Sequence, residues 1–313
     1  MKIVIVGAGA LGSLFGGLLA RAGAEVSLYN PSNVEHIWAI AREGLRLERD
    51  GESFQIAVEA RTTPEDLSQA DWVGIFVKAH QTGRAMAEIG PQISPRAWVF
   101  SLQNGVGMES EILQFISKER FVRGVTSQGA TLLGPGRVRW AGVGPTKLGR
   151  WEGPLTPEIE ALRELLCRAG IETEFSESIE RLLWEKLLIN CAINPLTAIF
   201  DRPNGALLED VQLREIAREV VRETLRVARA HGVVLSEAEA IERVEAVAAK
   251  TARNISSMLQ DVRRGRPTEI DYINGAVVRE GARLGIPTPL NLLLVKLIAE
   301  GRMKHPAQQM EAH

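Results

Sequence analysis

The sequence predicts an α/β protein, in which a doubly wound, mostly parallel sheet is followed by a second, all-helical domain. Up to about residue 150, short apolar strands alternate with helical stretches, which is typical of parallel sheets buried on both faces. From about residue 178 onward only helical patterns remain. We therefore expect domains at residues 1–177 and 178–313, with ligands bound in a cleft between them.

Within the first domain, helices separate short apolar strands. The expected strands are 2–6, 25–29, 72–77, 97–102, 121–126 and 171–175, and the expected helices are 11–22, 80–90, 108–116 and 157–169. Glycines and prolines between residues 134 and 145 bound two more strands, 137–141 and 146–150, which we expect to form an antiparallel hairpin at the sheet edge. The helices expected in the second domain are 179–200, 209–231, 236–264, 268–284 and 289–303.

The composition is that of an ordinary globular protein, with 313 residues, 45% of them hydrophobic and 24% charged. A net charge of −2 gives no electrostatic reason to expect nucleic acid or a membrane as a partner. Cys167 and Cys191 each stand among apolar residues, which indicates two buried free thiols in a reducing, cytoplasmic compartment. No spacing of histidines and cysteines indicates a metal site.

The most informative segment is IVIVGAGALG at residues 3–12. A β-branched strand enters a G-x-G-x-x-G turn that opens a helix, which is the context of a Rossmann-type dinucleotide site. Gly7 would allow the tight turn, Gly9 would let a pyrophosphate approach the backbone, and Gly12 would let the helix pack close to the strand. A secretory signal is the competing interpretation, and the five glycines between residues 7 and 17 argue against it.

A second informative segment is the helix expected at residues 179–200, which is apolar almost all round and should be buried. Its polar exceptions fall on one stripe, formed by Lys186, Asn190, Asn194 and Thr197. Because a lysine is rarely buried without a partner, this stripe fits a polar cleft. A lysine that extends to solvent, with amides bonded to a neighbouring loop, fits the stripe equally well.

Two later segments add further polar groups. Asn254, Ser257 and Asp261 have the spacing of one helix face, and Glu269 stands in the first turn of the helix expected after a proline. Each has an ordinary alternative: a helical serine can bond a carbonyl one turn back, and a first-turn carboxylate complements the helix dipole. Together with Lys186, however, these groups suit the binding of a small polar acid and the protonation of a carbonyl.

At these residues the sequence resembles the ketopantoate reductase (2-dehydropantoate 2-reductase) family, nearly from end to end. The segments that carry the resemblance are GAGALG at 7–12, VKAHQ at 77–81, QNGVG at 103–107, WEKLLINCAINPLTAIF at 184–200, RPNGAL at 202–207, NISSMLQD at 254–261 and TEIDYING at 268–275. The resemblance implies that the chain reduces 2-dehydropantoate to (R)-pantoate with NADPH, on the route to pantothenate and coenzyme A.

The resemblance also implies roles for individual residues. Lys186 would be the catalytic proton donor, and Glu269 would lie between the substrate and the nicotinamide ribose. The residues implied to bind the coenzyme are Gly7, Ala8, Gly9, Ala10, Leu11, Gly12, Lys78, Asn104, Ala130 and Glu269. The residues implied to bind the substrate are Asn104, Lys186, Asn190, Asn194, Asn204, Asn254 and Ser257. Desolvation would lower the pKa of Lys186 and a nearby Glu269 would raise it, and the sequence does not rank these effects.

One departure from the family concerns the coenzyme. In the family an arginine after the second strand commonly binds the 2′-phosphate of NADPH, whereas here that strand is followed by Asn30, Pro31, Ser32 and Asn33. The acidic residue typical of NAD enzymes is also missing there. The amides and the serine would hydrogen-bond either group, and Arg42 is a candidate cation on the following helix. NADPH is the coenzyme that the family resemblance implies, with NADH as the alternative.

Other functions fit parts of the sequence. A reductase of a related 2-oxo acid or imine would use the same scaffold, because one sequence does not show the pocket that recognises the hydroxyl and gem-dimethyl groups of pantoate. A non-catalytic NADP-binding sensor would need no proton donor, and it leaves Lys186 unexplained. The helices expected at 209–231 and 236–264 are candidates for a homodimer interface, although their charged faces suit solvent as well.

Overall fold

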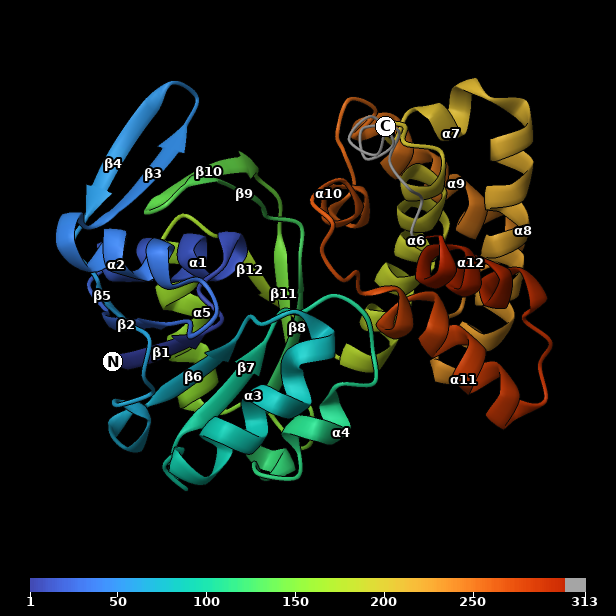
Figure 1. The fold of residues 1–313 in the computed structure, drawn as a ribbon. Helices are drawn as coiled ribbons and strands as arrows, with labels where there is room; N and C mark the ends of the chain where they lie inside the picture. The colour runs from blue at the N-terminus through green and yellow to red at the C-terminus, as the bar shows by residue number, and fades with distance from the viewer. Residues whose placement is uncertain (302–313) are drawn as a thin grey trace. The chain divides into compact units, whose positions relative to one another are not determined.

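The computed structural model describes residues 1–301, which form two compact units (Figure 1). The first unit contains Met1–Gln103 and Met108–Ile179, and the second contains Asn104–Gly107 and the chain from Glu180 onward. The loop Asn104–Gly107 was expected in the first domain, but its contacts assign it to the second unit. Within residues 1–301, none of the helices has the length and apolar character that crossing a bilayer requires.

An eight-stranded sheet forms the centre of the first unit. Its strands are β1 (Lys2–Val6), β2 (Glu25–Tyr29), β5 (Glu59–Arg61), β6 (Trp72–Ile75), β7 (Trp98–Ser101), β8 (Phe121–Thr126), β11 (Thr146–Arg150) and β12 (Thr173–Phe175). They are arranged in the order β12-β11-β8-β7-β6-β1-β2-β5, and β8 and β11 are the one antiparallel pair in this sheet. This arrangement confirms the doubly wound, mostly parallel sheet.

Helices cover both faces of this sheet, because its strands are apolar on both. Ile3 and Ile5 of β1 pack in one core with α1 (Ala10–Arg21), α2 (Val34–Glu43) and α5 (Pro157–Arg168). Val4 and Val6 point to the opposite face and pack with α3 (Thr82–Ile89) and α4 (Glu109–Ile112). Figure 1 shows α1 above the sheet and α3 below it. Short 3₁₀ turns lie at Leu67–Gln69, Ala79–Gln81, Gly90–Gln92 and Lys118–Arg120.

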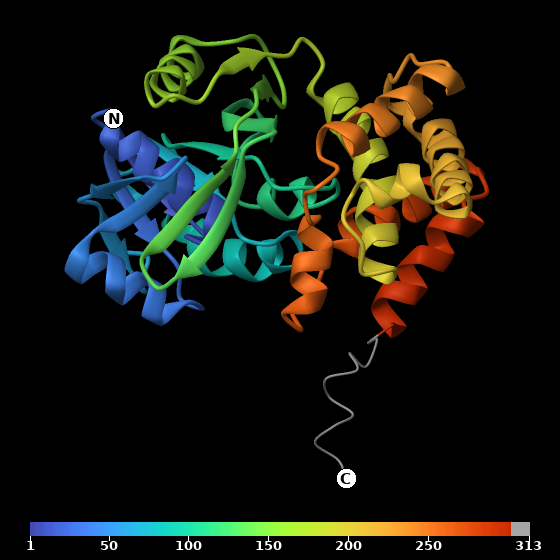
Figure 2. The same ribbon diagram turned by 90° about the horizontal axis from the view of Figure 1, so that it is seen from above.

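A second, four-stranded sheet packs against α1, and the sequence analysis did not predict it. It consists of β3 (Leu45–Arg49), β4 (Glu52–Ile56), β9 (Gly129–Gly134) and β10 (Arg137–Gly142), in the order β4-β3-β10-β9. A Cβ on Gly17 of α1 would lie 2.6 Å from Leu45 and 3.3 Å from Leu47, so the helix approaches this sheet closely. In Figure 2 the long green hairpin is formed by β9 and β10.

The hairpin expected from residues 137–141 and 146–150 is wrong. The turn that follows Gly134 joins β9 to β10, and Ala130 of β9 pairs with Trp140 of β10. After Gly142 the chain returns to the eight-stranded sheet, where β11 pairs with β8. The missed strands β3 and β4 had a sequence signal, because the Asp50-Gly51 dipeptide between them is typical of two-residue hairpins.

His36 joins three elements of the first unit through buried hydrogen bonds. Its Nδ1 accepts the Gly136 N–H at 3.0 Å, so the ring proton is on Nε2 and is donated to Ser13 Oγ at 2.9 Å. These bonds link α2 to α1 and to the turn between β9 and β10. The residue is 1% exposed, and burial lowers the pKa of His36 below its ordinary value because the charged ring would lose its hydration.

We expect the free energy of unfolding to fall as the pH is lowered below about 6.5, with His36 contributing to the fall. In this range the unfolded chain protonates His36 before the folded protein does, so protonation favours unfolding. Urea unfolding at about pH 7.5, 6.5 and 5.5 measures the effect. In His36→Gln the fall below about pH 6.5 should be smaller than in the wild type, and an equal fall would show that His36 is not responsible.

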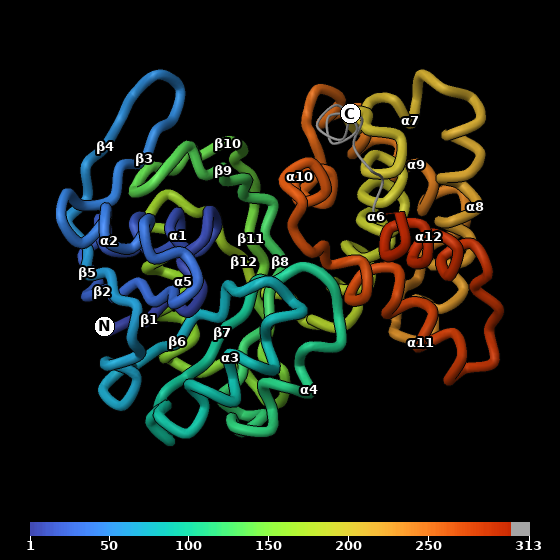
Figure 3. Tube along the Cα trace, viewed as in Figure 1, coloured from blue at the N-terminus to red at the C-terminus, as the bar shows by residue number. Residues whose placement is uncertain are grey.

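Within the described residues, the second unit contains helices and connecting turns. The helices are α6 (Ile179–Ile199), α7 (Ala206–Glu209), α8 (Val211–Ala228), α9 (Glu237–Lys250), α10 (Ser257–Arg263), α11 (Asn274–Leu284) and α12 (Pro289–Glu300), with 3₁₀ turns at Arg229–His231 and Ile270–Tyr272. The apolar helix α6 contributes Trp184, Leu187 and Leu188 to a core that also contains residues of the other helices, α7 to α12. Figure 3 traces α6 through this bundle, which confirms the helical second domain.

Two expected helices of this unit are wrong in detail. The single helix expected over 236–264 is interrupted, because α9 ends at Lys250 and Ser256 caps α10 by accepting the Leu259 N–H at 3.1 Å. The signal for this break was the group of polar residues before Ser256, together with Ser256 itself, because serine is a preferred N-cap residue. Glu269 does not lie in the first turn of a helix, because it precedes the 3₁₀ turn Ile270–Tyr272 and α11 begins only at Asn274.

Candidate functional site

The three glycines of the turn between β1 and α1 have different surroundings. Gly7 has a φ of +96°, and a Cβ there would lie 2.4 Å from the Val77 nitrogen. A Cβ on Gly12 would lie 2.4 Å from the Gly7 carbonyl oxygen. For a Cβ on Gly9, by contrast, the nearest neighbour within residues 1–301 would be the Gly7 carbonyl oxygen, at 4.0 Å. Gly7 and Gly12 are therefore required by the turn and its packing, whereas Gly9 faces open space.

The N-terminus of α1 is suited to an anion. No side chain among residues 1–301 caps it, and its first turn holds no acidic residue. The turn is fixed in place, because the N–H groups of Gly7 and Ala8 donate to the Tyr29 carbonyl oxygen at 2.9 and 3.1 Å. Uncapped N–H groups, the helix dipole and the open space at Gly9 together fit the pyrophosphate of a dinucleotide.

Three other predicted coenzyme residues lie in different places. One lies at the same edge of the eight-stranded sheet as the glycine turn, one lies in the four-stranded sheet that packs against α1, and one lies in the loop after β7. Lys78 follows β6, which is the neighbour of β1, and it precedes the 3₁₀ turn Ala79–Gln81. The carboxyl ends of parallel strands meet at one edge, so Lys78 and the glycine turn share that edge. Ala130 lies on β9 and packs against the core that contains α1. Asn104 follows β7 in the loop that belongs to the second unit.

Within the second unit, α6 carries three of the predicted residues. Lys186 and Asn190 are half-buried and Asn194 is buried. Thr197, the fourth member of the expected polar stripe, lies with its hydroxyl 2.7 Å from Ser256 Oγ, the cap of α10. Thr197 therefore fastens α6 to the start of α10, where the predicted residue Ser257 is exposed.

Pro195 leads to a hydrogen bond between α6 and the segment that carries Glu269. Proline has no N–H, so the Cys191 carbonyl one turn earlier lacks its helical donor. The fully buried Asn274 donates its side-chain amide to that carbonyl instead, at 3.1 Å. Because Asn274 begins α11 shortly after Glu269, this bond fixes the Glu269 segment against α6. The sequence analysis missed Asn274, although a proline inside a helix was a signal that a carbonyl would need another donor.

The loop that carries Asn104 is bound to the turn that follows Glu269. The Val106 N–H donates to the Tyr272 carbonyl oxygen at 3.0 Å, and a Cβ on Gly105 would lie 2.3 Å from that oxygen. Glu269 is itself 6% exposed, and its carbonyl oxygen accepts the Tyr272 N–H at 3.0 Å. The second unit therefore brings the Asn104 loop and the Glu269 segment together through Tyr272.

Asn204 and Asn254 also lie together. The Asn204 N–H donates to the Asn254 carbonyl oxygen at 3.0 Å, and Asn204 Nδ2 donates to Thr251 Oγ1 at 2.9 Å. Asn254 was expected on one helix face with Ser257 and Asp261, and this is wrong because it lies in the connection before α10. Asn204 Oδ1 is buried without a hydrogen-bond partner, so it is an acceptor that a ligand's donor would satisfy.

Comparison with known proteins identifies the family. The model of ketopantoate reductase PanE/ApbA matches residues 3–153, and the model of its C-terminal domain matches residues 178–302. The chain belongs to the ketopantoate reductase family. Among relatives of this family member, the 2-dehydropantoate 2-reductase of Pyrococcus horikoshii is 38% identical over 95% of the chain and 96% of the relative. That of Halobacterium salinarum is 36% identical over 95% and 98%.

Solved structures of similar proteins share the whole fold of this family member. A ketopantoate reductase from Ralstonia eutropha JMP134 is 37% identical, with a TM-score of 0.87 over 97% of this chain and 100% of that one. A D-mandelate dehydrogenase, solved with NADH and anilino(oxo)acetate, is 31% identical, with a TM-score of 0.90 over 96% and 97%. Enzymes similar to this family member therefore include one that binds a 2-oxo acid analogue other than ketopantoate.

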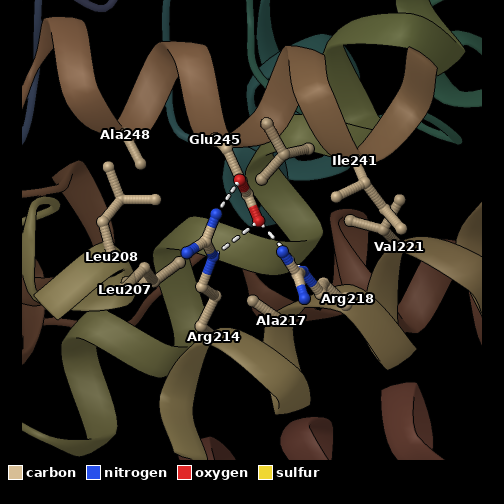
Figure 4. Close-up of a pocket in the computed structure, with 10 residues that line it drawn as sticks. Leu207, Leu208, Arg214, Ala217, Arg218, Val221, Ile241, Glu245 and Ala248 are labelled. Carbon is tan, nitrogen blue, oxygen red and sulfur yellow. Dashed lines mark hydrogen bonds and ion pairs between the residues drawn. The ribbon is translucent and has the colours of Figure 1, made fainter. Parts of the chain in front are cut away.

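A pocket of this family member lies between α7, α8 and α9, and none of the predicted site residues lines it (Figure 4). Its wall is largely apolar, with Leu207 and Leu208 on one side. Arg214 and Arg218 both bond Glu245, with their Nε atoms 2.8 and 3.0 Å from its Oε1. These charges compensate one another at the pocket. Among residues 1–301, no group of three His, Cys, Asp or Glu side chains is arranged to hold a metal ion.

Proposed function

We propose that this ketopantoate reductase family member reduces 2-dehydropantoate to (R)-pantoate, toward pantothenate and coenzyme A. The observation that carries the proposal is the match of both family models, at residues 3–153 and 178–302. The glycine turn supports it, because its open space and uncapped helix fit a dinucleotide. The names of relatives 36–38% identical support the choice of substrate.

In the proposed reaction, the chemistry that a reduced coenzyme held at the glycine turn would supply is a hydride for the C2 carbon of the ketone. Negative charge then develops on the carbonyl oxygen. Lys186 would stabilise this charge with its ammonium group and donate the proton that completes the alcohol. Its half-buried position on α6 supports this role, because partial exclusion of water strengthens the interaction between the ammonium and the oxygen.

The remaining residues would bind and orient the reactants. Glu269, which is buried, would lie between the substrate and the nicotinamide ribose. The substrate would be held by Asn104, Asn190, Asn194, Asn204, Asn254 and Ser257. The unsatisfied Oδ1 of Asn204 supports a substrate that brings a hydroxyl donor, as 2-dehydropantoate does.

For the coenzyme, we propose NADPH on the family resemblance, with the phosphate bound by amides in place of an arginine. Asn30 Oδ1 accepts the N–H groups of Ser32 and Asn33 at 2.9 and 3.2 Å, which leaves its Nδ2 as the donor at the end of β2. Arg42 lies in the last turn of α2 and bonds Glu43 at 3.1 Å. A neutral amide binds a phosphate more weakly than a guanidinium does, so we expect a small preference.

A second candidate function is the NADH-dependent reduction of another 2-oxo acid. It is favoured by the structural likeness to the D-mandelate dehydrogenase, at a TM-score of 0.90. The end of β2, which has no arginine between Asn30 and Asn33, is compatible with the coenzyme in that structure.

Initial rates with four pairs of reactants test the proposal: ketopantoate and 2-oxoisovalerate, each with NADPH and with NADH. We expect kcat/KM for ketopantoate to exceed that for 2-oxoisovalerate by at least about 10²-fold, because a site built for a hydroxyl rejects the analogue without it. The preference for NADPH should be below about tenfold. Equal kcat/KM for the two acids, with NADH used at least as well as NADPH, would favour the second candidate.

Cysteine chemistry supports a reducing compartment, and we propose the cytoplasm. Both cysteines are free thiols. Cys191 is buried as expected, and burial raises the pKa of its thiol. The expectation that Cys167 is buried too is wrong, because it lies on the exposed side of α5.

A further inference from the structure

A fully buried arginine bonds the amino end of the loop that carries Asn104. Arg123 lies on β8, paired with Ser101 of β7, and is 0% exposed. Its Nη1 donates to the carbonyl oxygens of Ser101 and Gln103, at 3.2 and 3.0 Å. These are the last groups of the first unit before Asn104, so the guanidinium fixes the point at which the loop begins.

The same side chain holds the carboxyl end of the loop. Arg123 Nε donates to Glu109 Oε1 at 2.8 Å, and its Nη2 lies 3.1 Å from Met108 Sδ. Met108 is the first residue after the loop Asn104–Gly107, and Glu109 begins α4. One planar guanidinium therefore determines where both ends of the loop lie. Only arginine, with five donors in a rigid fork, can bond groups on both sides at once.

Gln103 extends this network toward Lys78. Its Nε2 donates to the Val77 carbonyl oxygen and to Thr82 Oγ1, both at 2.8 Å. Its Oε1 accepts the Ser101 hydroxyl at 2.8 Å. Val77 immediately precedes Lys78, so the backbone positions of Lys78 and of the Asn104 loop are set by one connected group of buried polar side chains.

A buried ion pair is a costly way to stabilise a fold, because both charges lose their hydration. Apolar residues of similar volume commonly serve as well or better in the core. The Arg123–Glu109 pair therefore calls for a reason other than stability, and its position at the two ends of the loop supplies one. A short loop with fixed ends has few conformations, which pre-organises the side chain that it carries.

We propose that Arg123 is a positioning residue for the reduction, which acts by fixing the loop that places the Asn104 amide. This inference rests on the proposed function, in which Asn104 contacts the nicotinamide and the substrate. Arg123 itself touches neither. A loss of its bonds would let the loop shift, and a displacement near 1 Å at a reacting group is enough to slow an enzyme by about 10²-fold.

The test replaces both charges together, in Arg123→Met/Glu109→Gln, so that no carboxylate is left buried and unpaired. We expect kcat to fall by about 10- to 100-fold at a temperature where the variant is folded, with little change in coenzyme Kd. In an Asn104→Ala background the same two substitutions should change kcat by less than about twofold, because the group they position is gone. Wild-type kcat in the folded variant, or an equal loss in both backgrounds, would overturn the inference.

Two further variants separate positioning from stability. Glu245→Gln is the control, because Glu245 also bonds arginine side chains, those of Arg214 and Arg218, in a pocket that none of the predicted site residues lines. It should lower Tm without changing kcat. Arg123→Lys keeps a buried positive charge beside Glu109 but cannot bond both ends of the loop. Compared with Arg123→Met/Glu109→Gln, it should therefore have a Tm closer to that of the wild type, whereas its kcat should remain low. If kcat follows Tm across all the variants, Arg123 has only a structural role.

Amide hydrogen exchange distinguishes a failure of this inference from a failure of the proposed function, because it needs no substrate. Exchange in peptides that cover residues 102–109 should be at least about tenfold faster in Arg123→Lys than in the wild type, with no change in α8 and α9. Unchanged exchange there contradicts the inference whatever the substrate is. Faster exchange in a protein that reduces no 2-oxo acid would support the loop anchor and reject the proposed function.

Discussion

Lys186→Ala should lower kcat by at least about 10²-fold, with less than about a threefold change in coenzyme Kd. The variant would lose both the ammonium that stabilises charge on the carbonyl oxygen and the proton that it donates. Alanine favours helix, so α6 should keep its structure and the loss should be chemical. Stopped-flow and steady-state kinetics with ketopantoate measure kcat, and quenching of protein fluorescence measures coenzyme binding.

The matched control is Lys250→Ala, which removes an exposed lysine from the last turn of α9. It should leave kcat unchanged, because no proposed role involves it. Near-normal kcat in Lys186→Ala would remove Lys186 from the role of proton donor. A loss of kcat in both variants would instead point to a general effect on the second unit.

The second large effect concerns substitutions of two glycines in one motif. One substitution should lower the stability of the fold, and the other should weaken coenzyme binding. Gly7→Ala should destabilise the fold by about 2–5 kcal/mol, because its φ is +96° and the added Cβ would lie 2.4 Å from the Val77 nitrogen. Gly9→Ala should leave stability nearly unchanged, since φ is −88° there and the Cβ would enter open space. The same methyl should raise coenzyme Kd by at least about tenfold, because it would stand where we expect the pyrophosphate.

Urea unfolding without coenzyme and fluorescence titration with it measure the two effects separately. Each variant is the control for the other, because both add one methyl group to the same turn. Equal coenzyme Kd in Gly9→Ala and the wild type would show that the phosphates do not approach Gly9. A stable Gly7→Ala would show that the turn can relax, and that its close approach to Val77 is not required.

Local sequence patterns were sufficient for the elements on which the coenzyme site is built. The alternation of apolar strands with helices predicted β1, α1 and β2 closely, because burial on both faces requires continuous apolar strands and amphipathic helices. The apolar helix α6 was predicted for a similar reason. The glycine turn was predicted because its residue types are required by close contacts within one short segment, and such requirements are visible in the segment itself.

The arrangement of distant segments was decided only by the tertiary structure. His36 bonds Gly136, 100 residues away. This contact joins α2 to the turn after β9, in a four-stranded sheet whose pairing of β3 with β10 is not indicated by either segment alone. Asn274 bonds the carbonyl that Pro195 leaves without a donor, although 83 residues separate Asn274 from Cys191. The exposed Asn254 likewise lies beside Asn204 because the expected helix is interrupted there. Its helical spacing to Ser257 and Asp261 did not indicate this contact.

The physical reason is that periodicity reports which face of an element is buried, but not what covers it. Lys186 and Glu269 were candidates from their own segments, and Asn104 was a candidate from the family resemblance. The bonds that hold their segments, through Arg123, Gln103, Asn274 and Tyr272, join groups that the chain brings together only when it folds. The sequence by itself determined the fold class and the chemical groups available, whereas packing between distant elements decided which of those groups are held in place and by what.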